Sequence, residues 1–364
     1  MTVVLCGCGG ISRAWLEAAA KVGGIRILGL VDLRREAAEK RAAEFGLPGV
    51  EVGTDLLALI QKVRPMAVFD CTVPEAHADV TILALEQGCH VLGEKPMADS
   101  MENARRMVRA SGRTGKIYAV TQTRRYAQGL RRIQAFLRSG ALGTVHTIHS
   151  DFFIGAHFGG FRDTMKHVLL LDMAIHTFDA ARMLSGADPV SVQAFDWNPS
   201  GSWYAHGASA VAAFKMRLPP PPAPLPSLAN REAGLAGGGE GEGGELIYTY
   251  RGSWCADGLP TTWECSWRIL GTRGTLLWDG GGNARAEIIT QAGGFNSKVG
   301  PVEVPPAPAG DGFEGHAGVL REFRDCVLEG RVPETACTDN IRSLAMVLSA
   351  IESAESGNRI PVQW

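Results

Sequence analysis

The sequence has no strong net charge, no paired-cysteine motif and no long apolar run, and each absence excludes a class of protein. The 36 basic and 38 acidic residues leave a formal charge of −2, so we expect neither nucleic acid nor a membrane surface as a partner. The eight cysteines contain no CxxC pair, which indicates reduced thiols in a cytoplasmic protein. No segment holds about 18 consecutive apolar residues, and the first residues do not resemble a signal peptide, so we expect a soluble protein.

Metal-ligating motifs are absent as well. The nine histidines offer no HExxH or comparable cluster, so no metal centre is predicted. What the chain does have is length and apolar content. Its 364 residues, 45% of them hydrophobic, can bury a sizeable core and predict two domains.

The first third of the chain alternates short apolar strands with helices, which predicts an α/β fold with a parallel, doubly wound Rossmann sheet. The predicted strands are residues 2–6, 25–31, 66–71, 90–92 and 116–121. The predicted helices are residues 12–22, 34–45, 76–87 and 101–111. We expect residues 1–121 to form this domain.

Beyond residue 121 the strands follow one another with little helix between them, which predicts a second, α+β domain with an open, mostly antiparallel sheet over residues 122–340. Its predicted strands are residues 144–153, 191–197, 209–216, 246–253, 262–270 and 274–278, and its helices are 131–139, 169–184 and 319–328. Residues 219–245 are rich in proline and glycine and predict a disordered insertion. A helix over 340–355, within a segment 341–364, is expected to pack back on the first domain.

A glycine-rich turn follows the first strand and opens the first helix. Gly7 permits a tight reversal, and Gly9 lets the backbone approach a pyrophosphate at the positive end of the helix. Gly10 and Ile11 complete the turn, while Ser12 stands where the third glycine of the dinucleotide fingerprint is usual. The turn therefore predicts a dinucleotide site.

Asp32 ends the second strand, twenty residues beyond the turn, where a carboxylate can accept hydrogen bonds from the adenosine ribose and repel a 2′-phosphate. This predicts NAD as the cofactor, with Leu33 beside it. Arg34 and Arg35 leave NADP open, because a guanidinium there can bind the 2′-phosphate.

Two further segments carry chemistry. Glu94, Lys95 and a proline follow the strand at residues 90–92, and the carboxyl ends of parallel strands are where ligands bind in such sheets. Asp172 and His176 lie four apart on a predicted helix and share one face. An acid and an imidazole so placed form an ion pair, a metal site or a catalytic pair.

Taken together, the glycine turn, Pro74 and His77, the Glu94-Lys95-Pro96 tripeptide and the DxxxHxxD pattern resemble the glucose-fructose oxidoreductase and inositol dehydrogenase (Gfo/Idh/MocA) family of nicotinamide-dependent enzymes. The resemblance spans nearly the whole chain. It implies Lys95, Asp172 and His176 as the catalytic set, and a homodimer or tetramer formed through the second sheet. The chain departs from the family pattern at residues 166–169, where the glycine-rich lead is missing, and in the insertion at 219–245.

Oxidation of a secondary alcohol needs these residue types. The hydroxyl loses a proton to a base whose pKa is near neutral, a role that suits His176. Lys95 can stabilise the developing charge on the oxygen, and Asp172 can hold a neighbouring hydroxyl or orient the imidazole. A sugar or polyol is the substrate class that we expect.

Further residues are predicted near the ligands. Expected cofactor contacts besides the glycine turn and Asp32 are Leu33, Arg34, Thr72, Pro74, His77, Glu94 and Lys95, with His77 in a supporting role at best. Expected substrate contacts besides the catalytic set are Arg125, Tyr126 and Arg162, with Phe161, Trp203, Tyr204 and Trp254 as aromatic candidates. Arg162 has a structural salt bridge as its alternative interpretation.

Two other functions compete with a dehydrogenase. One is a glycoside-cleaving enzyme that uses NAD transiently for oxidation, elimination and reduction. The other is a non-catalytic dinucleotide sensor, which would be expected to have lost the lysine or the histidine. Both Lys95 and His176 are present, so the sensor ranks last.

Overall fold

The computed structural model describes residues 1–219, 244–310 and 312–364. The predicted insertion at 219–245 falls outside the described residues except at its ends. Within the described part, no helix is both long and apolar enough to cross a membrane.

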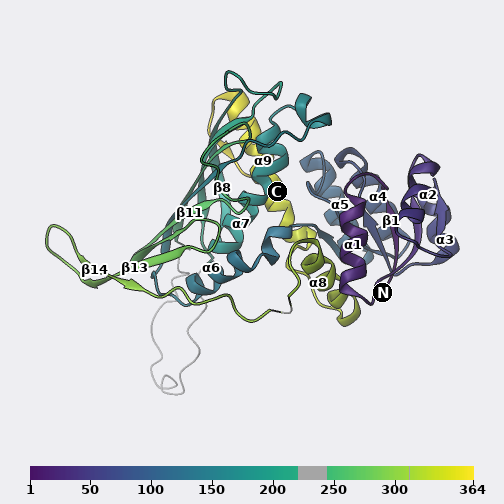
Figure 1. Ribbon diagram of the computed structural model, residues 1–364, viewed down its shortest axis with the longest axis horizontal. Coiled ribbons are helices and arrows are strands. Elements are labelled where there is room, and N and C mark those ends of the chain that lie inside the picture. Colours follow the sequence, from purple (N-terminus) through teal and green to yellow (C-terminus); the bar gives the residue numbers. More distant parts are fainter. Residues whose placement is uncertain (220–243, 311) are drawn as a thin grey trace, which may run out of the picture.

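The first sheet has six parallel strands in the order β3-β2-β1-β4-β5-β6, which is a Rossmann arrangement and confirms the predicted fold class (Figure 1). Its strands are β1 (Thr2–Cys6), β2 (Arg26–Val31), β3 (Glu51–Gly53), β4 (Ala67–Asp70), β5 (His90–Gly93) and β6 (Tyr118–Val120). Its helices are α1 (Ser12–Val22), α2 (Arg35–Glu44), α3 (Leu56–Val63), α4 (Pro74–Glu86) and α5 (Met101–Thr114). The central strands β1 and β4 are buried along nearly their whole length, as parallel strands covered by helices on both faces must be.

The sequence analysis missed β3 and α3. The helix has local signals that could have revealed it: Asp55 caps its N-terminus by accepting a hydrogen bond from the Ala58 amide at 3.0 Å, and Leu56, Leu59 and Ile60 are buried on one face. The strand has only three residues and no apolar alternation. The strand is therefore defined by its pairing with β2 and not by its own residue pattern.

The second sheet has nine strands in the order β14-β13-β12-β11-β7-β10-β9-β8-β15, of which only β7 and β10 pair in parallel. Its strands are β7 (Val145–Phe153), β8 (Asp188–Trp197), β9 (Ser209–Arg217), β10 (Glu245–Ser253), β11 (Ser266–Gly271), β12 (Gly274–Trp278), β13 (Ala284–Gln291), β14 (Lys298–Val302) and β15 (Ile360–Pro361). The open, mostly antiparallel sheet is thus confirmed. The sequence analysis missed β13, β14 and the short β15.

One predicted strand is partly wrong. Residues 262–270 were expected to be extended, but β11 begins only at Ser266, and Thr262 to Cys265 form a turn closed by a hydrogen bond of 3.1 Å from the Cys265 amide to the Thr262 carbonyl. Cys265 has a φ of +67°, a left-handed conformation that a strand cannot contain. Trp263 and Glu264 therefore lie in the turn and not in a strand of the sheet.

The remaining helices lie between the two sheets or against the first domain. They are α6 (Gln128–Arg138), α7 (Ile175–Ser185), α8 (Gly315–Glu329) and α9 (Cys337–Ser356), and Figure 1 shows α7 and α9 on the side of the second sheet that faces the first sheet. Helix α8 packs against α1, and α9 contacts β8 and α7 as well as α5 and β6. The C-terminal helix therefore packs on both halves, while the domain boundaries at 121/122 and 340/341 stay a prediction.

Candidate active site

The glycine turn between β1 and α1 leaves open space where a ligand can approach. Gly7 has a φ of +91°, and a Cβ on it would lie 2.6 Å from the carbonyl carbon of Cys71. By contrast, a Cβ on Gly9 or Gly10 would meet no atom within 4 Å. Gly7 is therefore required by the fold, whereas Gly9 and Gly10 border a free cradle at the N-terminus of α1, which fits a pyrophosphate.

Asp32 lies at the end of β2 and holds the glycine turn in place. Its carboxylate accepts hydrogen bonds from the Cys8 amide at 2.8 Å and from the Arg34 amide at 2.9 Å. Each carboxylate oxygen keeps acceptor capacity for a ribose hydroxyl. The side chains of Leu33 and Arg34 are exposed beside it, with Leu33 93% exposed. These residues fit NAD.

Sequence reasoning missed Arg41, which supports the same turn from α2. Its Nη2 donates to the Gly9 carbonyl at 2.9 Å, and its Nη1 donates to Glu44 at 2.6 Å. No local pattern marks this arginine, because the contact depends on how α2 packs beside the turn.

Thr72, Pro74 and His77 follow β4 and brace the neighbouring loop. The His77 ring lies between two carbonyl oxygens, with Nδ1 3.0 Å from that of Pro96 and Nε2 3.1 Å from that of Thr72. His77 is 1% exposed, so we assign it to holding these two segments together rather than to contacting a cofactor. Pro74 begins α4.

Glu94 is a buried junction between three segments. One of its carboxylate oxygens accepts from the Trp15 indole at 2.6 Å and lies 3.5 Å from Nε2 of His316, and the other accepts from the Lys95 amide at 3.0 Å. Burial raises the pKa of Glu94, but the hydrogen bonds from His316 and Trp15 outweigh it, and the pKa lies below its usual value. Glu94 thus fixes the backbone from which Lys95 projects.

Lys95, Asp172 and Arg162 form one ion-pair cluster. Lys95 Nζ donates to Asp172 Oδ1 at 2.8 Å and to its main-chain carbonyl at 2.9 Å, and Arg162 Nε donates to Oδ2 at 2.6 Å. Burial raises the pKa of Asp172, but the charges of Lys95 and Arg162 hold it below its usual value. The structure therefore brings together three residues that the sequence analysis singled out, and Asp172 is a carboxylate.

Asp172 lies in a π-helical segment, Leu169–Ala174, that continues directly into α7. The predicted helix over 169–184 is thus present, but its first turns are wider than those of an α-helix. Single π-turns are frequent at functional sites, because they re-aim side chains relative to the rest of the helix.

His176, in the first turn of α7, is half-buried, and its buried Nδ1 has no hydrogen-bond partner. Burial lowers the pKa of His176 well below 6.5, and the charges of Lys95, Arg124 and His316 lower it further. The expectation of a base whose pKa is near neutral is therefore wrong for the ligand-free protein. The imidazole is neutral at neutral pH and able to accept a proton.

Arg125 and Tyr126 contact residues other than Lys95, Asp172 and Arg162. Arg125 Nε and Nη2 each donate to Asp179 at 2.7 Å, and Nη2 also donates to Asp339 at 2.6 Å. The Tyr126 hydroxyl donates to Glu322. Both side chains are buried and engaged with protein partners, which favours a structural role for them over substrate contact. Asp179, the last residue of the DxxxHxxD pattern, is a partner for Arg125.

The aromatic candidates divide by exposure. Tyr204 and Trp254 are buried and stack with ring centroids 5.7 Å apart, and the half-buried Trp203 donates from its indole to the Ala156 carbonyl at 3.1 Å, which favours structural roles for these three. Phe161 is 63% exposed, and its ring centroid lies 4.6 Å from the Arg162 guanidinium.

Two residues near His176 were missed from the sequence. Arg124 Nη1 donates to the Thr177 hydroxyl at 3.0 Å, and His316 reaches the site from the start of α8. The pair at Arg124 and Arg125 was visible in the sequence, but only the fold decides which one faces His176. For His316 there was no local signal.

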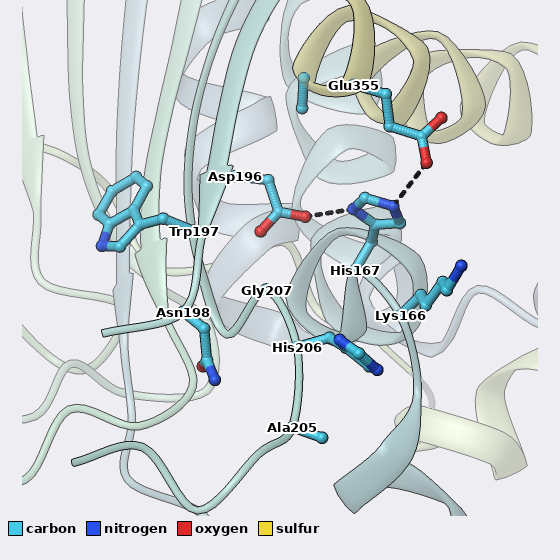
Figure 2. A pocket seen from close by; sticks show the side chains of 10 residues that line it. Lys166, His167, Asp196, Trp197, Asn198, Ala205, His206, Gly207 and Glu355 are labelled. Carbon is cyan, nitrogen blue, oxygen red and sulfur yellow. Dashed lines mark hydrogen bonds and ion pairs between the residues drawn. The ribbon is translucent and has the colours of Figure 1, made fainter. Parts of the chain in front are cut away.

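A separate pocket of about 400 Å³ lies beside the lead into the π-helix (Figure 2). His167, whose φ is +50°, lies there between two carboxylates, with Nδ1 on Asp196 and Nε2 3.1 Å from Glu355. The hydrogen bond with Asp196 raises the pKa of His167. This histidine occupies a left-handed position in the lead where the glycine-rich family pattern is missing. Among the described residues, no three histidine, cysteine or acidic side chains are grouped as a metal site.

Comparison with known proteins places this geometry in a family. A model described as "Oxidoreductase family, NAD-binding Rossmann fold" matches residues 1–122, and one for the GFO/IDH/MocA C-terminal domain matches residues 130–217, together more than half of the chain. The chain is 23% identical to a 1,5-anhydro-D-fructose reductase of Ensifer adhaerens over 99% of this chain and 98% of that protein. It is 32% identical to an inositol 2-dehydrogenase of Streptomyces avermitilis over 49% of this chain and 51% of that protein.

Solved structures share the fold over the whole chain. An oxidoreductase from Agrobacterium radiobacter, crystallised with NAD+, L-tartaric acid and magnesium, superimposes with a TM-score of 0.78 at 20% identity. The match covers 100% of this chain and 98% of that one.

Proposed function

The chain belongs to the Gfo/Idh/MocA family of NAD-binding oxidoreductases, and from this premise we propose that it moves a hydride between NAD and a secondary hydroxyl or carbonyl carbon of a neutral sugar or polyol. The observation that carries the proposal is the contact of Lys95 with Asp172, together with the unpartnered Nδ1 of His176, whose pKa the charge of Lys95 lowers. It brings a cation, an anion and a proton acceptor together at the carboxyl end of β5, where ligands bind in Rossmann sheets.

The cofactor residues would be the glycine turn and Asp32. The open space at Gly9 and Gly10 accommodates a pyrophosphate, and Asp32 receives the ribose hydroxyls. NAD, when bound, supplies the hydride acceptor. The other groups that the reaction needs come from the protein.

Three side chains would share the work on the substrate oxygen. In the direction of oxidation, His176 accepts the hydroxyl proton, since its low pKa keeps the imidazole neutral. Lys95 donates a hydrogen bond to the same oxygen and stabilises its growing negative charge. Asp172 orients the Lys95 ammonium through two contacts and is itself held by Arg162. In the reverse direction, protonated His176 returns the proton to the oxygen.

The substrate class rests on two kinds of support. The similar proteins include one named for a sugar ketone and one named for inositol. The site itself offers hydrogen-bonding side chains of both signs in Lys95, Asp172 and Arg162, a set that suits several hydroxyl groups.

A substrate panel tests the proposal. Purified protein with NAD or NADP is mixed with inositols, aldoses, aldonates and glycosides, and the reduced nicotinamide is followed by absorbance. We expect steady NADH formation with at least one neutral polyol or sugar. Absence of turnover with every neutral member, in a protein that binds NAD, would contradict the proposal.

The same panel separates the glycoside-cleaving alternative. An enzyme that oxidises a sugar carbon, eliminates the aglycone and then reduces the carbon again consumes a glycoside without accumulating NADH. Release of an aglycone from a nitrophenyl glycoside at constant NADH would favour that alternative over a dehydrogenase.

A further inference from the structure

The turn from Thr262 to Cys265, between β10 and β11, is fixed against the helix that carries His176. The Cys265 side chain is buried, and its Sγ lies 3.3 Å from the hydroxyl of Thr177, the residue after His176. Arg124 Nη1 donates to both Cys265 Sγ at 3.5 Å and Thr177 Oγ1 at 3.0 Å. The turn therefore has a defined position next to the first turn of α7.

Glu264, in the middle of this turn, has an unused acceptor. Its Oε2 is buried without a hydrogen-bond partner, and the nearest cationic atom, Nε of Arg124, is 4.0 Å away, beyond hydrogen-bonding distance. Burial raises the pKa of Glu264, and the charge of Arg124 only partly opposes this. An unsatisfied buried acceptor destabilises the folded protein, so its presence calls for a reason. The rest of the side chain is exposed, 28% of its surface in all, so a ligand can approach Glu264 from that side.

Trp263, the neighbouring residue, presents an exposed aromatic surface. It is 46% exposed, and its ring centroid lies 6.2 Å from that of Phe158. The Phe158 ring is 5.2 Å from the guanidinium of Arg162, which holds Asp172. A continuous series of contacts thus runs from Trp263 to the carboxylate of Asp172.

Two routes therefore connect the turn to the candidate active site. The first passes from Trp263 through Phe158 and Arg162 to Asp172, and the second passes from Glu264 through Arg124 to Thr177 beside His176.

We propose that the Thr262–Cys265 turn is the substrate-recognition element: Glu264 accepts hydrogen bonds from neighbouring hydroxyl groups of a neutral sugar or polyol ring, and Trp263 stacks on the C–H face of that ring. The proposal rests on the proposed function and names the part of the site that selects the substrate. A carboxylate with a free oxygen suits two adjacent hydroxyls. The same negative charge disfavours an acidic substrate, since Arg124 already donates to Thr177 and Cys265.

The test compares four substitutions with two controls. Glu264→Gln removes the negative charge and Glu264→Ala removes the side chain, while Trp263→Phe keeps an aromatic face and Trp263→Ala does not. Glu287→Gln on β13 and Trp197→Phe on β8 are matched controls, because Glu287 is exposed and Trp197 is 47% exposed. For each protein, kcat/KM with the best neutral substrate of the panel and the Kd of NAD are measured.

The expected result is a loss in kcat/KM of about tenfold for Glu264→Gln and about a hundredfold for Glu264→Ala, mostly as a rise in KM. Trp263→Ala should lose about tenfold, with most of it restored in Trp263→Phe. The Kd of NAD should stay within about twofold in all variants, and both controls should match the wild type.

Other results separate this inference from the proposed function. If the wild type oxidises a neutral substrate and the Glu264 and Trp263 variants equal the controls, the recognition role is wrong and the function stands. If the wild type prefers an acid such as D-glucuronate, the recognition role is wrong as well. If no member is turned over, saturation-transfer NMR with myo-inositol and D-glucose on the NAD complex decides: binding lost in Glu264→Ala supports the recognition role without the function, and binding that is absent or unchanged overturns both.

Discussion

Lys95 donates two hydrogen bonds to Asp172, with its Nζ 2.8 Å from the carboxylate and 2.9 Å from the main-chain carbonyl of that residue. Lys95 follows the fifth strand of the first sheet, and Asp172 lies in the π-helical lead into α7 under the second sheet. This contact therefore joins the candidate cofactor half to the candidate substrate half of the protein. The predictions below follow from that junction and from the groups around it.

Substitution of Gly7 should lower the stability of the protein, whereas substitution of Gly9 should lower its affinity for NAD. Gly7→Ala places a Cβ 2.6 Å from main-chain atoms at a φ of +91°, so we expect a loss of unfolding free energy of about 2 kcal/mol or more. Gly9→Ala meets no atom in the ligand-free protein, so stability should be unchanged while NAD affinity falls at least tenfold. Thermal unfolding and NAD titration measure both. A Gly9→Ala protein with normal NAD affinity would show that the cradle is elsewhere.

Asp32 should make NAD the preferred cofactor. Its carboxylate repels a 2′-phosphate, and the exposed Arg34 contacts this carboxylate through its main-chain amide. We expect a lower Kd for NAD than for NADP, and a narrower or reversed ratio in Asp32→Ser. Titration of both cofactors by fluorescence provides the values. A tighter Kd for NADP in the wild type would mean that Arg34 or Arg35 dominates.

The activity should depend on pH through a histidine that is hard to protonate. Because the pKa of His176 in the folded protein lies well below 6.5, protonation of this residue should not limit oxidation at neutral pH. The acidic limb of kcat/KM is therefore expected below pH 6.5. An acidic limb of kcat/KM that lies above pH 6.5 and disappears in His176→Gln would contradict a lowered pKa for His176.

His167 should stabilise the fold most at acidic pH. Asp196 raises the pKa of His167 in the folded protein, so its stabilisation is fully present below 6.5 and is lost as the pH rises through the folded value. We expect His167→Gln to lose about 1 kcal/mol of unfolding free energy at pH 6 and less at pH 9. Urea unfolding at both pH values tests this. An equal or larger loss at pH 9 would exclude an ionic role for His167.

The sequence predicted well those features that are local. The glycine turn, the carboxyl end of β5 and the positions of Asp172 and His176 are set by short-range patterns, and the structure brings Lys95, Asp172 and Arg162 together. The features that could not be predicted from the sequence depend on contacts between segments that are far apart along the chain. His316 reaches Glu94 only because α8 packs on α1, and no pattern near residue 316 records this.

One predicted strand is partly wrong, and one residue predicted as a substrate contact is engaged with a protein partner, for different physical reasons. The segment Thr262–Cys265 was predicted as a strand because its apolar and aromatic residues are typical of strands. It forms a turn instead, because Cys265 has a left-handed backbone conformation and its side chain is held by Arg124 and Thr177. Arg125 was predicted as a substrate contact because a fixed hydrogen-bond donor suits a carbohydrate. The buried Asp179 engages it instead.

The most direct test of the account measures turnover and cofactor binding together in Lys95→Ala and His176→Ala, with Arg285→Ala on β13 as an exposed control. The account predicts that kcat/KM on the substrate found in the panel falls by about a hundredfold or more in each variant, while the Kd of NAD stays within about threefold of the wild type. The reason is that these side chains contact the substrate oxygen and not the pyrophosphate turn. Near-normal turnover in His176→Ala, or a collapse of NAD binding in both variants, would contradict the account.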